Sequence, residues 1–219
     1  MKKEIKIVVP TDYSAVSLKK YLQIQLDLEQ YSDDDDAQNA FLVWNLCGLT
    51  PNMTNALDNE TLQNIIVDLK QLLNKQDFDL TRIVEIEGIK YGFEPNLAKM
   101  SYGSYLDLTR FKEISINDDW ASIMSILYRP VTKQKGALYE VEPYKGEEPK
   151  NKDKWLSVNM DVHFGCFFFF NRISHLLLKD TLNSSKETLE MEVTHPFINT
   201  IFQKSGEAIQ ALFPSQTKI

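Results

Sequence analysis

The segment from residue 162 to residue 178 is apolar around most of the circumference that it would have as a helix. A helix that is hydrophobic all round is normally buried in a protein core. The segment is barely long enough to cross a bilayer and contains polar residues (His163, Asn171, Arg172 and His175), so a membrane span is not expected. A chain of 219 residues, 43% of them hydrophobic, can bury a sizeable core. The sequence therefore predicts a central core helix over about residues 156–182.

The amino-terminal part has apolar residues at helical spacing after a short alternating segment. Residues 4–9 alternate charged and aliphatic side chains before Pro10, which predicts a half-buried strand. Helices are predicted over about 18–31 with Ser14 or Ser17 as cap, over 37–47 with Gly48 after it, in a turn at Pro51, and over about 59–73 with Asp58 or Asn59 as cap.

From Thr81 onward the apolar period changes to two. Alternation on both sides of Gly88 predicts a β-hairpin over about residues 82–93. Short helices are expected over about 100–108 and 118–128, an exposed loop over 132–153 that flanks a strand at 137–141, and a last helix over about 196–212.

These elements predict an α+β fold that is predominantly helical, a helical bundle with a small antiparallel β-sheet or hairpin. Residues 1–80 are expected to form a strand and an acidic helical subdomain. Residues 81–219 are expected to form a mixed hairpin and core-helix region that makes one compact unit with the first.

The negative charge of the chain is concentrated in its amino-terminal third. The formal net charge is −7, and residues 1–80 have 13 acidic against 7 basic side chains, while the rest has 18 against 17. Such a chain gains little from counterion release on a phosphate backbone, so direct nucleic-acid binding is not expected. A basic or neutral protein surface is the better partner. The run of Asp33, Asp34, Asp35 and Asp36 is interpreted both as a solvated linker and as negative charge at a helix start.

No residue pattern predicts a catalytic, cofactor or metal site. The histidines lack the spacing of a helical zinc site, and the aspartate run lacks the alternation and glycine of a calcium loop. Ser17 and Lys20 match a Ser-x-x-Lys pattern without its companion motifs. Cys47 and Cys166 lie far apart in apolar segments and are interpreted as two buried thiols.

The tyrosines of the middle region are expected in the core or at a protein interface, where aromatic residues often anchor a partner. The predicted interface residues are Asp33, Asp34, Asp35, Asp36, Tyr91, Phe93, Tyr102, Tyr105 and Tyr144.

Four short segments resemble a group of proteins from the tail-assembly region of tailed bacteriophages, usually described as tail assembly chaperone-like. The segments are Tyr91 to Asn96 (Tyr-Gly-Phe-x-Pro-Asn), Gly103 to Leu108 (Gly-x-Tyr-x-Asp-Leu), Leu127 to Pro130 (Leu-Tyr-Arg-Pro) and Tyr139 to Tyr144 (Tyr-x-Val-x-Pro-Tyr). The resemblance implies a non-enzymatic assembly factor without cofactor.

Such a factor keeps a long tape-measure protein soluble in the host cytoplasm while the tail forms. The resemblance leaves open a structural subunit of the virion in a connector, tail or internal position, and it leaves open self-association. In either case the implied partners are other phage proteins and not a membrane.

Overall fold

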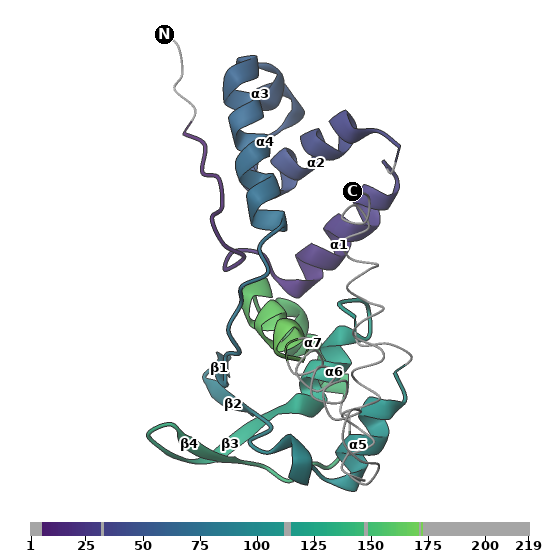
Figure 1. Ribbon diagram of the computed structural model, residues 1–219, viewed down its shortest axis with the longest axis vertical. Helices are drawn as coiled ribbons and strands as arrows, with labels where there is room; N and C mark the ends of the chain where they lie inside the picture. Colours follow the sequence, from purple (N-terminus) through teal and green to yellow (C-terminus); the bar gives the residue numbers. More distant parts are fainter. Residues whose placement is uncertain (1–5, 32, 112–114, 147–148, 171, 173–219) are drawn as a thin grey trace, which may run out of the picture. The chain divides into compact units, whose positions relative to one another are not determined.

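The computed structural model describes residues 6–31, 33–111, 115–146, 149–170 and 172 (Figure 1). By their contacts these residues divide into two compact units. The first comprises the described residues up to Asp77 together with Asn159–Asp161, and the second comprises those from Phe78 to Val158 and from Val162 onward.

The first unit is helical, and each of its helices begins at a side-chain cap. Its helices are α1 (Leu18–Glu29), α2 (Asp35–Cys47), α3 (Pro51–Asn55) and α4 (Asn59–Leu73), capped by Ser17, Asp34, Thr50 and Asp58. Each cap accepts a hydrogen bond from a backbone N–H in the first turn, which satisfies a donor that has no partner inside the helix. Gly48 ends α2 with a φ of 68°, a conformation that favours glycine. The predicted helices in this region are confirmed.

The core of the first unit is aliphatic and lies among α1, α2 and α4. Its buried members are Ile24, Leu42, Val43, Leu49, Ile65, Ile66 and Leu69. On α4 the buried residues Ile65, Ile66 and Leu69 recur at helical spacing, which is the pattern from which this helix was predicted.

The predicted strand over residues 4–9 is wrong for residues 6–9, which belong to no strand, and residues 4 and 5 lie outside the described residues. Ile7 and Val9 are partly buried and pack against the helical core. The alternation that suggested a strand therefore reflects one side of the segment facing helices, without a neighbouring strand to pair with.

The second unit contains an antiparallel sheet of strand order β1-β2-β3-β4. Strand β1 (Ile83–Ile86) pairs with β2 (Ile89–Phe93), and Ile86 lies opposite Ile89. Glu87 and Gly88 connect them with φ values of 52° and 78°, as in the two-residue turns whose twist fits a hairpin. The predicted hairpin is confirmed.

Strands β3 (Tyr128–Lys135) and β4 (Leu138–Val141) form a ribbon that reaches beyond the shorter strands (Figure 1). Only Tyr128–Pro130 of β3 pair with β2, while the rest of β3 pairs with β4 across a register shift between Val131 and Lys133. The exposed loop predicted from residue 132 is therefore wrong for 132–135. Residues 132–138 are all exposed, so their polar character reflects solvent on both faces of the ribbon.

Among the described residues, the second unit contains helices α5 (Tyr102–Thr109), α6 (Trp120–Leu127) and α7 (Pro149–Ser157), the 3-10 turn η1 (Leu97–Lys99), and a further helical stretch that ends at residue 170. Helices α5 and α6 confirm the predictions for 100–108 and 118–128. The start of α7 lies where the exposed loop was predicted.

The predicted core helix over 156–182 is interrupted. Helix α7 ends at Ser157, Asn159 makes an isolated β-bridge with Ser17, and residues 160–170 are helical. Phe164, Phe167, Phe168 and Phe170 are buried as predicted. The remainder of that prediction, from residue 173, and the predicted helix over 196–212 lie outside the described residues.

The class is α+β with a four-stranded antiparallel sheet, about 52% helical in the described part. This confirms the predicted class and antiparallel pairing, whereas a helical bundle is not confirmed.

Candidate functional site

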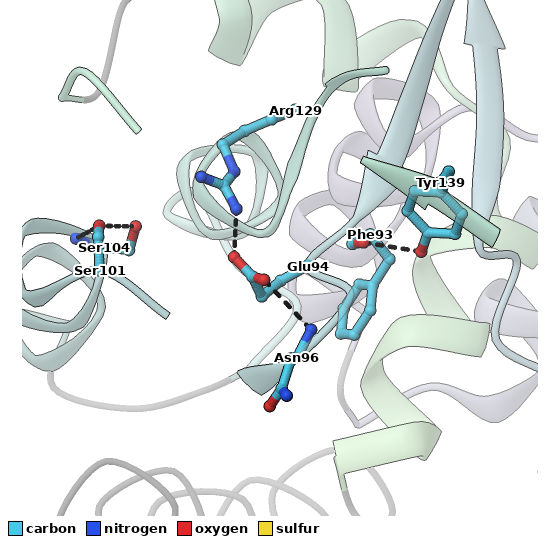
Figure 2. A network of polar contacts seen from close by, with 7 residues as sticks. All are labelled: Phe93, Glu94, Asn96, Ser101, Ser104, Arg129 and Tyr139. Atoms are coloured by element: carbon cyan, nitrogen blue, oxygen red, sulfur yellow. Dashed lines mark hydrogen bonds and ion pairs between the residues drawn. The ribbon is translucent and has the colours of Figure 1, made fainter. Parts of the chain in front are cut away.

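The four motif segments converge on one cluster in the second unit, part of which Figure 2 shows. Its centre is an ion pair between Arg129, from β3, and Glu94, which follows β2, with side chains only 11% and 10% exposed. The other oxygen of the Glu94 carboxylate accepts the backbone N–H of Asn96 at 3.2 Å. The Leu-Tyr-Arg-Pro segment is thereby joined to the turn that follows Phe93.

A second contact joins the Tyr-x-Val-x-Pro-Tyr segment to the same turn. The Tyr139 hydroxyl donates to the carbonyl of Phe93 at 2.7 Å (Figure 2), and burial raises the pKa of this tyrosine. A Cβ atom at Gly92 would lie 2.6 Å from the Tyr139 ring and 2.9 Å from Val141. Glycine is therefore required at position 92 because β4 packs directly against its backbone.

Helix α5 is joined to the cluster through Tyr144. The Tyr144 hydroxyl donates to the Asp107 carboxylate at 2.7 Å, and the Tyr144 ring lies 3.4 Å from where a Cβ of Gly103 would stand. Asp107 also pairs with Arg110 at 2.8 Å. In the Gly-x-Tyr-x-Asp-Leu segment, the glycine thus leaves room for the Tyr144 ring and the aspartate accepts the hydrogen bond from the Tyr144 hydroxyl.

Two of the predicted interface residues, Tyr91 and Phe93, are instead core residues. They are 3% and 2% exposed. The Tyr91 ring meets Trp155 edge-on at 6.0 Å, and Phe93 meets Tyr128 in the same manner at 5.3 Å. Tyr91 and Phe93 are thus part of the aromatic core. The prediction that they lie at an interface on the surface is wrong.

The exposed part of the cluster is the outer face of α5. Tyr102 is 73% exposed, and its ring stacks on the half-buried Tyr105 at 6.2 Å with an interplanar angle of 23°. Leu106, one turn after Tyr102, is also exposed. Ser101 fixes the start of the helix, because its Oγ accepts the backbone N–H of Ser104 (Figure 2). We call Tyr102, Tyr105 and Leu106 the α5 face.

Sequence reasoning missed Leu106 as a member of this face. The sequence signal is the spacing of the two leucines, because residues two apart in a helix point to nearly opposite sides, so Leu106 and Leu108 could not both face the core. It also missed Leu138, near the turn of the β3–β4 ribbon, which is the most exposed of the large hydrophobic side chains in the described residues.

The run of Asp33, Asp34, Asp35 and Asp36, which lies in the first unit, is exposed throughout. Asp34 caps α2 by accepting the backbone N–H of Ala37 at 2.9 Å, and Asp35 and Asp36 lie in the first turn. Negative charge is favourable at this position because it faces the positive end of the helix dipole. The run therefore has a structural role at the start of α2 and also presents charge to solvent.

Of the groups with catalytic potential, Ser17 has a structural partner, Cys166 is buried and Cys47 is half-buried. Ser17 caps α1 by accepting the backbone N–H of Lys20, so its hydroxyl is committed to the helix. Cys166 is buried, and burial raises the pKa of its thiol and also that of Cys47. Among the described residues no group of histidine, cysteine and carboxylate side chains could hold a metal ion. His175 and His195 lie outside the described residues.

None of the helices in the described residues has the length and the apolar character needed to cross a membrane. Comparisons of the chain with protein-family models, with curated proteins and with solved structures find no match.

Proposed function

We propose that this chain is a non-enzymatic phage morphogenesis protein, a tail assembly chaperone-like factor that binds another tail protein of the tape-measure type. The proposal assigns it to the host cytoplasm during assembly. The observation that carries it is the α5 face, where Tyr102 is 73% exposed on a helix held firmly by its neighbours.

An exposed, pre-positioned tyrosine is suited to binding. Tyrosine is enriched among the residues that dominate interface energies, and a side chain already held in place loses little freedom when it binds. The stack on Tyr105 and the bond from Tyr144 to Asp107 restrict this part of α5 before any partner arrives.

Charge supports a protein partner that is neutral or basic. The acidic excess of residues 1–80 would steer such a partner toward the first unit, more weakly as the salt concentration rises.

A second candidate is a structural subunit of the virion, in a connector, tail or internal position. The β3–β4 ribbon favours it, because residues 132–138 are exposed throughout. A two-stranded ribbon is only marginally stable alone, and docking on a neighbouring subunit would stabilise it.

The α5 face can be tested by copurification of the tape-measure protein with this chain after coexpression. Tyr102→Ser should reduce the recovered tape-measure protein at least about tenfold if the tyrosine is an anchor. Leu138→Ser, which removes an equally exposed apolar side chain from the ribbon, is the matched control and should leave recovery unchanged. Equal recovery with all three proteins would contradict the assignment of this face.

A further inference from the structure

A groove of about 480 Å³ lies in the first unit between the amino-terminal segment and α4. Its lining residues are Val9, Pro10, Thr11, Asp68, Gln71, Leu72 and Lys75. Figure 1 shows the segment running beside α4 without regular structure of its own.

The backbone of this segment has an open edge. No hydrogen bond within the described residues engages the backbone of residues 6–10. Lys6, Ile7, Val8 and Val9 each have an N–H and a C=O that can pair with an added strand, whereas Pro10 has no N–H. The edge therefore extends over residues 6–9.

The side chains of the segment alternate as they do in a strand. Ile7 and Val9 pack against the helical core, and Val8 between them is 67% exposed. Val67, which precedes the lining residue Asp68 on α4, is 52% exposed. Exposed aliphatic side chains thus belong to both elements that line the groove.

The charge of the groove favours a basic occupant. Asp68 and Lys75 are the charged lining residues, and Lys75 already interacts with the carboxylate of Asp12. The groove lies within residues 1–80, which contain 13 acidic and 7 basic side chains.

We propose that residues 6–9 and this groove are the docking edge for an extended, basic and aliphatic segment of a partner protein. The segment would add as a β-strand along residues 6–9 and place one apolar side chain in the groove, with a lysine or arginine toward Asp68. Main-chain hydrogen bonds supply affinity in this mode, and alternate side chains supply specificity. The inference rests on the proposed function.

The test is a titration of the full chain with a fluorescent peptide of alternating lysine and valine, followed by amide hydrogen exchange. We expect binding that slows exchange at residues 6–9. Binding should weaken at least about tenfold for a glutamate–valine peptide, and likewise for a lysine–valine peptide N-methylated on alternate amides, which cannot pair as a strand. Val8→Pro should have the same effect because it removes a donor from the edge, whereas Val8→Thr keeps the donor and should bind normally.

Three results would overturn the proposal. These are an absence of binding, equal affinity for the N-methylated peptide, and slow exchange at residues 6–9 already in the chain alone, which would mean that another segment of the chain occupies the edge. Peptide binding with no capture of a tail protein would retain the edge and reject the proposed function. If the chain captures a tail protein and Val8→Pro does not reduce that capture, the proposed function would be retained and the docking edge rejected.

Discussion

The indole N–H of Trp120 donates to Nδ1 of His163 at 3.1 Å, and both side chains are fully buried. Because Nδ1 accepts this bond, the proton of the neutral ring is on Nε2, which donates to the carbonyl of Trp155 at 3.1 Å. A protonated ring would turn Nδ1 into a second donor facing the indole. The arrangement therefore requires a neutral histidine.

This relationship predicts how stability depends on pH. Burial lowers the pKa of His163 to about 4, so in the folded state the ring stays neutral while the unfolded chain binds a proton below about pH 6.5. The contribution to stability is fully present above pH 6.5 and is lost as the pH falls toward 4. It amounts to roughly 3 kcal/mol over that range.

The measurement is urea denaturation between pH 4 and pH 7 for the native chain and for His163→Gln. We expect the native chain to lose more stability than the variant over this interval. His175 and His195 are retained in both proteins, so their titration cancels in the comparison. Parallel pH profiles would show that His163 does not titrate in this way.

Gly92→Ala should destabilise the chain by about 1 to 3 kcal/mol, because the new methyl group would stand 2.6 Å from the Tyr139 ring. The check is a double-mutant cycle in urea denaturation with Tyr139→Ala, which removes the ring that the methyl group meets. In the Tyr139→Ala background the same glycine substitution should cost clearly less. Strictly additive effects would argue against the close contact.

Glu94→Gln should destabilise the second unit by about 3 kcal/mol, because it leaves the guanidinium of Arg129 in a largely buried place without its counter-charge. The double variant Glu94→Gln/Arg129→Met removes both charges and should recover part of the loss. Thermal unfolding of the two variants checks this. A double variant less stable than Glu94→Gln alone would contradict it.

Asp34→Ala should cost about 1 kcal/mol through the lost cap of α2. Asp33→Ala is the matched control, since Asp33 is exposed and lies outside the helix. Thermal unfolding should separate the two, with the control within about 0.5 kcal/mol of the native chain. An equal loss of stability in the two variants would contradict the stabilising role of the Asp34 cap.

Local signals predicted much of this fold. The cap at Ser17, the left-handed Gly48 and the hairpin turn at Gly88 are decided by residues within a few positions of one another. The interruption after Ser157 was not predicted, because neither proline nor glycine marks it and the apolar residues continue past it. The bridge from Asn159 to Ser17 depends on a partner far away in the sequence.

The candidate site was predicted only in part for the same reason. Aromatic composition singled out Tyr91, Phe93 and Tyr102 alike, but it does not say which ring faces a core and which faces solvent. The pairing of Glu94 with Arg129 joins residues 35 apart in sequence. Arg129 belongs to the Leu-Tyr-Arg-Pro motif, whereas Glu94 stands at the unspecified position of the Tyr-Gly-Phe-x-Pro-Asn motif, and their contact appears only when β2 and β3 pair.

Mass spectrometry of purified virions, read beside a lysate pull-down with this chain as bait, tests the central claim most directly. The account predicts that the chain is absent from virions and is recovered from lysate together with a long tape-measure protein. A fixed copy number in purified virions would contradict the chaperone assignment and favour a structural subunit.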